Sequence, residues 1–130
     1  MDKSQIAIVI PALNEEKTIE KIIKELSAYG KIIVVNDGSE DFTNKIASDA
    51  GAFVINHESN LGYDKALNSG CEYLSKKNFK YFITLDADGQ HSAKYIPSFI
   101  KYLKAGYKIV VGNRSSQARL GELIYSFIIK

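Results

Sequence analysis

The sequence lacks the features of a secreted, membrane-spanning or nucleic-acid-binding protein. It has a single cysteine, Cys71, so no internal disulfide can form, and we interpret this thiol as a small packing residue. No segment approaches the roughly 20 apolar residues that span a bilayer. The N-terminal apolar run is short and interrupted by Pro11, unlike a signal peptide. The 17 basic and 15 acidic residues give a net charge of +2, too balanced to favour nucleic acid as the main partner. We therefore expect a cytoplasmic protein.

Several motifs of common enzyme classes are also missing. No Gly-x-Gly-x-x-Gly follows the first apolar run, so a dinucleotide-binding Rossmann protein would lack its phosphate loop. There is no Gly-Lys-Ser/Thr loop and no serine in a nucleophile-elbow setting. These absences argue against dehydrogenases, P-loop enzymes and serine hydrolases.

What is present is a regular alternation of apolar strands and amphipathic helices. The 130 residues, 45% hydrophobic and 25% charged, fit one globular domain. The pattern predicts a three-layer, doubly wound, mostly parallel α/β sheet with right-handed crossovers. Asn14 is expected to cap the first helix. The expected strands cover residues 6–10, 31–37, 52–56, 81–85 and 107–112, and the expected helices cover 14–30, 39–51, the later part of 60–77, and 92–106.

Polar clusters follow four of the expected strands. PALNEE follows the first, NDGSED the second, DADGQH the fourth and GNRSS the fifth. Each cluster alone is compatible with ordinary turn chemistry. Ligands of doubly wound sheets bind beyond the carboxyl ends of the strands, so the coincidence of four clusters favours a binding site there.

The most specific of these clusters contains Asp86 and Asp88. Side chains two positions apart on a strand share a face, so both carboxylates can point into one crevice. A divalent cation would relieve their repulsion, and oxygen ligands suit Mg²⁺ or Mn²⁺ bound together with a diphosphate. Gln90 offers a further oxygen for the metal. His91 could serve as a ligand or base, but a helix-flanking role is the simpler interpretation.

Asp37 and Arg114 each allow two interpretations. Asp37 could cap the helix that follows it, or accept a hydrogen bond from the ring N–H of a nucleobase. Arg114 could be a solvated surface residue, or a forked donor to phosphate. A phosphatase with an aspartyl nucleophile is a rival for DADG, although its Asp-x-Asp pair would be expected after the first strand.

Taken in order, IVIPALNEE, VVNDGSED, NLGYDKALNSG, LDADGQH and VVGNRSS resemble glycosyltransferase family 2, most closely its polyprenyl- and dolichyl-phosphate sugar synthases. The resemblance implies a GT-A fold and a UDP- or GDP-sugar donor. It implies that Asp37 reads the base, that Asp86, Asp88 and Gln90 hold Mn²⁺ or Mg²⁺, and that Asp88 and Arg114 act on the departing diphosphate. It also implies donor contacts in a set of loop residues, namely Pro11, Ala12, Asn14, Glu15, Asn60 and Gly62, with Asn68 nearby. Tyr63 and Asp64 depart from the family pattern.

The resemblance implies a single inverting displacement at the anomeric carbon, with a lipid phosphate as a candidate acceptor. It extends from Ile6 to Arg114, so we expect residues 1–114 to form a nucleotide-sugar-binding domain. The acceptor-binding second half of the family's pattern is absent from this sequence. Over 115–130, the helical spacing of Leu120, Leu123, Ile124, Phe127 and Ile128 predicts an amphipathic helix. That helix could dock on the protein or on the missing half, or lie peripherally on a membrane. A homo-oligomer is a further possible partner arrangement of the chain. A nucleotide-sugar-binding module without catalysis and a metal-dependent nucleotidyl- or phosphotransferase remain alternatives.

Overall fold

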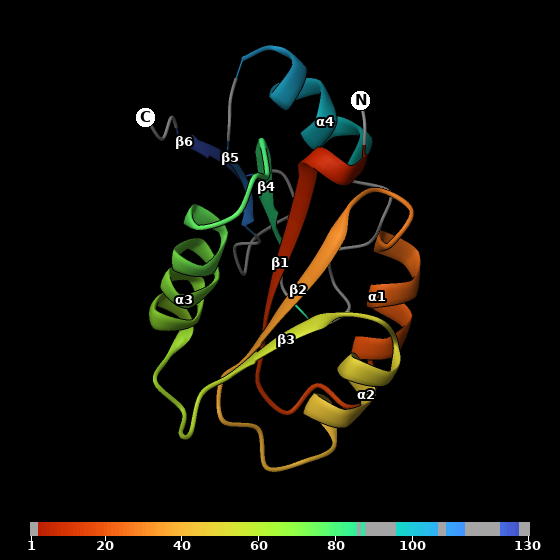
Figure 1. Ribbon diagram of the computed structural model, residues 1–130, viewed down its shortest axis with the longest axis vertical. Helices are drawn as coiled ribbons and strands as arrows, with labels where there is room; N and C mark the ends of the chain where they lie inside the picture. Colours follow the sequence, from red (N-terminus) through yellow and green to blue (C-terminus); the bar gives the residue numbers. More distant parts are fainter. Residues whose placement is uncertain (1–2, 86, 88–95, 107–108, 114–122, 128–130) are drawn as a thin grey trace.

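The protein is built on one six-stranded sheet with the strand order β3-β2-β1-β4-β5-β6 (Figure 1). The computed structural model describes residues 3–85, 87, 96–106, 109–113 and 123–127. Its strands are β1 (Ile6–Ala12), β2 (Lys31–Asn36), β3 (Phe53–Asn56), β4 (Tyr81–Thr84), β5 (Ile109–Asn113) and β6 (Leu123–Phe127). Its helices are a short 3₁₀ turn, η1 (Lys3–Gln5), followed by α1 (Ile19–Leu26), α2 (Thr43–Asp49), α3 (Tyr63–Ser75) and α4 (Ile96–Lys104).

The first five strands run parallel, and β6 pairs antiparallel with β5. All seven residues of the central strand β1 are buried, as a strand covered on both faces requires. The expected mostly parallel, doubly wound sheet is therefore confirmed.

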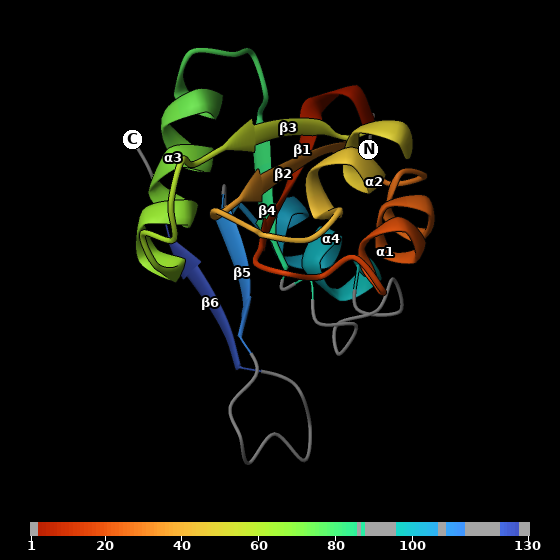
Figure 2. The same ribbon diagram turned by 90° about the horizontal axis from the view of Figure 1, so that it is seen from below.

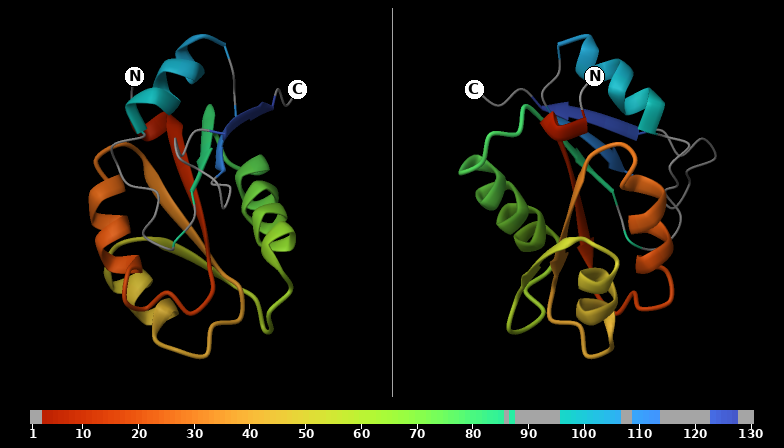
Figure 3. Two further views of the ribbon diagram at one scale, coloured as in Figure 1. Left: turned by 180° about the vertical axis from the view of Figure 1, so that it is seen from behind. Right: turned by 45° about the vertical axis from the view of Figure 1, so that its right-hand side comes forward.

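Helices cover both faces of the sheet and complete three layers (Figure 2). Helices α1, α2 and α4 pack on one face, in a shared core that includes Ile8 and Ile10 of β1. The apolar residues of α1 recur at three- and four-residue spacing, which places Ile19, Ile22, Ile23 and Leu26 in that core. Helix α3 covers the other face, where Val9 and Val35 are buried (Figure 3).

Helix α3 approaches β1 closely because of Gly70. A Cβ at this position would lie 2.6 Å from Cγ1 of Val9, which is shorter than any normal contact. Gly70 therefore fixes the distance between α3 and the sheet. None of the helices in the described part of the chain is long and apolar enough to cross a bilayer.

The expectation that Asn14 caps the first helix is wrong. Helix α1 begins at Ile19 after Thr18, and residues 15–18 form a turn that precedes it. Asn14 has φ 54°, in the left-handed region that Asn tolerates better than most residues. Its side chain instead bonds to the loop after β2.

The helix expected over 115–130 is also wrong where the structure describes this segment. Residues Leu123–Phe127 form strand β6, which pairs along the whole of β5. The sequence LIYSF is rich in β-branched and aromatic residues, and its large side chains also fit a period of two. Pairing with the edge of β5 decides between the two periodicities.

Candidate functional site

A cleft of about 520 Å³ lies at the carboxyl ends of the strands. Its lining comes from the end of β1 and the loop after it, from Asp37 after β2, from the loop before α3 and the start of α3, and from Ala87 after β4. The lining residues are Pro11, Ala12, Leu13, Glu15, Asp37, Asn60, Gly62, Tyr63, Ala66 and Ala87. The cleft thus lies where ligands bind in open α/β sheets.

The cleft opens at the point where the strand order reverses. Strand β1 continues beside β2 as far as Ala12, but its pairing with β4 ends at Val9 and Thr84. One further bond, from Leu85 N to Val9 O, closes the β1–β4 ladder. Backbone groups two residues apart on a strand point to the same side, so the backbone of Pro11, like that of Val9, faces the β4 side. Strand β4 has already ended there, and Pro11 has no N–H to offer it. The proline therefore costs no ladder bond and leaves space between the two strand ends.

Hydrogen bonds join the loop after β1 to the loop after β2. Asn14 N donates to Ser39 Oγ at 2.9 Å, and Glu40 N donates to Asn14 Oδ1 at 2.8 Å. One residue on, Glu15 N donates to Thr43 Oγ1 at 2.9 Å. These bonds fix two walls of the site relative to each other.

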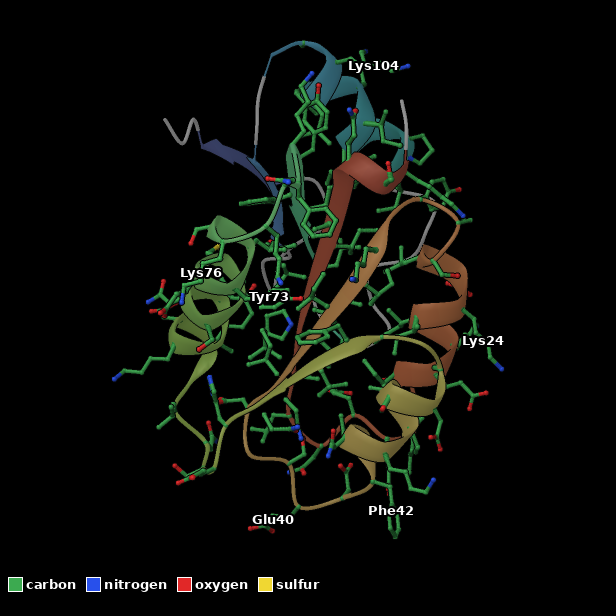
Figure 4. All side chains as sticks on the ribbon, viewed as in Figure 1. Lys24, Glu40, Phe42, Tyr73, Lys76 and Lys104 are labelled. Carbon is green, nitrogen blue, oxygen red and sulfur yellow. The ribbon has the colours of Figure 1, made fainter. Side chains whose placement is uncertain are left out.

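Further hydrogen bonds connect the loop after β1 to the start of α2. Glu16 N donates to Asp41 Oδ2, and Phe42 N donates to Glu16 Oε2. Asp41 also accepts from Thr43 N at 2.9 Å. Burial favours a raised pKa for Asp41, but the bonds from Thr43 and Glu16 outweigh it and hold the pKa below its ordinary value. Phe42 takes no part in the core: it is 68% exposed and points away from the protein (Figure 4).

Asp37 is the central polar residue of the cleft and is only 4% exposed. Its Oδ1 accepts from Leu61 N at 2.9 Å and lies 2.7 Å from Nδ1 of His57. Its Oδ2 accepts from Gly62 N at 2.9 Å. The side chain does not cap the helix that follows; it holds the loop that leads from β3 into α3.

These contacts keep Asp37 ionised. Burial favours a raised pKa for the carboxyl, but hydrogen bonds from His57, Leu61 and Gly62 outweigh it, so the pKa lies below its ordinary value. A buried carboxylate that is already hydrogen-bonded is an acceptor that can select a ligand by its donors.

The glycine after Asp37 is required by a close backbone approach. Gly38 has φ 77°, and a Cβ there would lie 2.4 Å from the carbonyl carbon of Ser59 and 2.5 Å from Asn60 N. The loop after β2 therefore lies directly against the loop after β3. A further bond, from Asn36 Nδ2 to Asn56 Oδ1 at 2.9 Å, joins the ends of these two strands.

Ala87 brings the fourth strand's loop to the cleft. It stands between Asp86 and Asp88 in the sequence and is 2% exposed. Its carbonyl accepts a 2.7 Å hydrogen bond from Thr18 Oγ1, just before α1. The loop after β4 is thereby tied to the loop after β1.

The expected site residues divide into three groups. Pro11, Ala12, Glu15, Asp37, Asn60 and Gly62 line the cleft together. Asn14 joins two loops beside it, and Asn68 is exposed on α3. Asp86, Asp88, Gln90, His91 and Arg114 lie outside the described residues. Among the residues that are described, no cluster of three or more His, Cys, Asp or Glu could hold a metal.

Three residues beside the cleft carry no signal in the sequence, namely His57, Thr43 and Ser69. His57 follows an expected strand, and its position in NHESN gave no sign that it would contact Asp37, 20 residues away. Thr43, which is fully buried, looked like a generic helix residue. The parallel pairing of β2 with β3 brings His57, which follows β3, to Asp37, which follows β2.

The whole matched region, from the first strand through the strand-end clusters, fits one family model. This model, described as Glycosyl transferase family 2, matches residues 7–120. The chain belongs to glycosyl transferase family 2. The cleft thus occupies the carboxyl end of the sheet in a member of this family.

Curated relatives include two with named activities. The chain is 32% identical over 129 residues to a UDP-N-acetylglucosamine–dolichyl-phosphate N-acetylglucosaminyltransferase of Methanococcus voltae, covering 84% of this chain and 51% of the relative. It is 29% identical to an undecaprenyl-phosphate 4-deoxy-4-formamido-L-arabinose transferase of Photorhabdus laumondii, covering 87% and 38%. An uncharacterized protein of Methanocaldococcus jannaschii is 42% identical, with 88% and 48% covered. The chain spans about half the length, or less, of these relatives.

Solved structures agree on the fold. Glucosyl-3-phosphoglycerate synthase from Mycobacterium tuberculosis, in complex with Mn²⁺, UDP-glucose and phosphoglyceric acid, superposes with a TM-score of 0.64 at 30% identity. The match covers 79% of this chain and 40% of the synthase. The same enzyme has also been solved with Mg²⁺ and UDP. The fold is accordingly of the GT-A type, in a chain that matches less than half of the synthase.

Proposed function

We propose that this chain is the donor-binding part of a metal-dependent, inverting glycosyltransferase that transfers a sugar from a nucleotide-diphospho-sugar, with a polyprenyl phosphate as the acceptor. The observation that carries the proposal is the cleft at the switch in strand order, in which a buried, ionised Asp37 and the residue between Asp86 and Asp88 both form part of the lining. The relatives named for dolichyl- and undecaprenyl-phosphate acceptors support the choice of acceptor.

The donor's parts would be bound by chemically distinct regions of the cleft. Asp37 would accept a hydrogen bond from the base, and Pro11, Ala12 and Glu15 would contact the nucleoside. Asn60 and Gly62, just before α3, complete the lining beside Asp37. The side chains of the lining are mostly apolar or amide groups, as is common in ligand pockets.

Asp86, Asp88 and Gln90 supply two carboxylates and an amide oxygen, a donor set that suits Mg²⁺ or Mn²⁺. When bound, the metal would stabilise negative charge on the departing diphosphate. Arg114 would add a forked donor to the same phosphates.

The reaction is a single displacement. An acceptor oxygen attacks the anomeric carbon, the bond from that carbon to the diphosphate oxygen breaks, and the nucleoside diphosphate leaves with the electron pair. The product bond lies on the opposite face of the sugar, so the configuration inverts. A phosphate acceptor is already ionised and needs little help from a general base.

Calorimetric titration tests donor binding. UDP and GDP are titrated into the protein with and without Mn²⁺, beside the variant Asp88→Ala and, as a control, Asp49→Ala on the exposed surface of α2. We expect metal-dependent binding of one nucleotide that is lost in Asp88→Ala and kept in Asp49→Ala. Absence of binding under every metal condition would refute the proposal.

A second candidate is a nucleotide-sugar-binding module without transferase activity. The cleft in the described residues fits nucleotide binding in either candidate. Incubation of the protein with a UDP- or GDP-sugar and polyprenyl phosphate separates the two. A sugar-lipid product would establish transfer, whereas binding without product would favour the module.

A further inference from the structure

A buried relay of hydrogen bonds connects the base-reading carboxylate to the helix that walls the cleft. His57 follows β3, and its Nδ1 lies 2.7 Å from Asp37 Oδ1. Its Nε2 lies 2.7 Å from Oγ of Ser69, on α3. The side chains of His57 and Asp37 are only 9% and 6% exposed. The relay therefore connects three separate elements: the end of β2, the end of β3 and the middle of α3.

The position of the proton on the ring follows from its partners. Asp37 is ionised, because its pKa lies below the ordinary value, and a carboxylate only accepts hydrogen bonds. Nδ1 of His57 must then carry the hydrogen that lies between them. In the neutral ring, Nε2 is an acceptor, and the hydroxyl of Ser69 donates to it. The relay thus fixes one tautomer.

The relay also limits what Asp37 can still accept. A carboxylate has about four acceptor positions. On Oδ1, His57 and Leu61 occupy both, and on Oδ2, Gly62 occupies one. Among the described contacts, one acceptor position remains, on Oδ2. Loss of His57 would open a second position on Oδ1 and release the carboxylate from one side.

An Asp–His–Ser sequence of hydrogen bonds also suggests a nucleophilic serine, but the surroundings of Ser69 do not fit one. Ser69 lies in the interior of the 13-residue helix α3, where backbone N–H groups are used by the helix itself. No pair of free N–H groups is thereby offered to an oxyanion. The relay therefore orients the carboxylate of Asp37 and does not make Ser69 a nucleophile.

We propose that His57 is a positioning residue that makes Asp37 selective for nucleobases with a ring N–H. This inference rests on the proposed function and concerns the same cleft. Uracil and guanine carry such an N–H, whereas the corresponding ring nitrogen of cytosine is an acceptor and would face the carboxylate unpaired. Asp37 has a single acceptor position left, in a fixed orientation, so it favours uracil and guanine over cytosine. With cytosine, the buried carboxylate oxygen would stay unpaired, which is strongly penalised.

The test compares the affinities of UDP and CDP, with Mn²⁺, in the wild-type chain and in two variants. In His57→Ala, the UDP-to-CDP affinity ratio should fall about tenfold, which corresponds to one charge-assisted hydrogen bond. In His57→Asn, the side-chain amide nitrogen stands close to the place of Nδ1, and the ratio should be restored to within about threefold of wild type. An effect on stability alone would lower both affinities together. An unchanged ratio in His57→Ala, or no recovery in His57→Asn, would overturn the inference.

NMR of the His57 ring in the wild-type chain tests the inference without depending on the folding of a variant. Long-range ¹H–¹⁵N NMR spectra of the His57 ring should show a hydrogen on Nδ1, which donates to Asp37, and the Nδ1 signal should move when UDP is added. The opposite tautomer, or signals that ignore UDP while it binds, would overturn the inference. Failure of the proposed function is distinct, because the wild-type protein would then bind none of UDP, GDP and CDP.

Discussion

Replacement of Gly38 by alanine tests whether the two loops beside the cleft need direct backbone contact. The new Cβ would lie 2.4 Å from the carbonyl carbon of Ser59 and 2.5 Å from Asn60 N. Both are backbone atoms, which cannot turn away as the end of a flexible side chain can. The loop that carries Asn60 and leads to Gly62 must therefore move away from Asp37.

The cost has two parts. A non-glycine residue at φ 77° costs about 1–2 kcal/mol. Relief of the backbone overlap costs a further 1–3 kcal/mol or so, as for other overpacked positions. We expect a loss of about 2–5 kcal/mol, out of a total stability of roughly 6–20 kcal/mol for a chain of this length.

Gly51→Ala is the matched control. Gly51 follows α2, has φ 101°, and has no atom within 4 Å of a Cβ built on it. Gly51→Ala has the same cost of a positive φ and the same gain from a stiffer unfolded chain as Gly38→Ala, but it creates no overlap with backbone atoms. Urea unfolding followed by circular dichroism should show that Gly38→Ala is less stable than Gly51→Ala by about 1–3 kcal/mol. Equal stabilities would refute the close approach of the two loops.

Other predictions concern the polar contacts of the site. Asp37→Asn should lose about 1–3 kcal/mol at neutral pH, because the amide cannot accept from all the donors that the carboxylate binds. The pKa of Asp37 is lowered in the folded state, so the stability difference between wild type and Asp37→Asn should be fully present above the ordinary value of 3.8. It should shrink as the pH falls through the folded-state pKa. Urea unfolding at several pH values measures this difference, and a difference that grows on acidification would contradict the prediction. Thr43→Val should cost about 1–3 kcal/mol, because Glu15 N–H loses its buried acceptor, and Thr43→Ser should restore most of it in the same assay. A Thr43→Val variant as stable as wild type would show that the hydrogen bond from Glu15 N to Thr43 contributes nothing.

The layered sheet could be predicted from sequence because its signals are local. Apolar runs such as Ile6–Ile10 and the three- and four-residue spacing of α1 each identify an element without knowledge of its neighbours. Pro11 also marks the end of the first run, although the strand itself continues to Ala12 because β4 has already left that side.

Features that depend on contacts between residues far apart in the sequence could not be predicted. The segment Leu123–Phe127 fits both a helical and a strand period, and only the free edge of β5 selects the strand. Asn14 looked like a helix cap, but its partners are Ser39 and Glu40 in another loop. His57 became part of the site only because β3 pairs with β2 and ends beside Asp37.

The central claim is that the cleft between the loops after β1, β2 and β3 binds the nucleotide of a sugar donor. Its most direct test is a ¹H–¹⁵N NMR titration of the 130-residue chain with UDP and Mg²⁺. We expect the largest shifts on the backbone amides of Ala12, Leu61 and Gly62. Amides beside the groove between β3 and α3, at Tyr73 and Lys76, should change little. Shifts concentrated at Tyr73 and Lys76, with none at Ala12, Leu61 and Gly62, would contradict it.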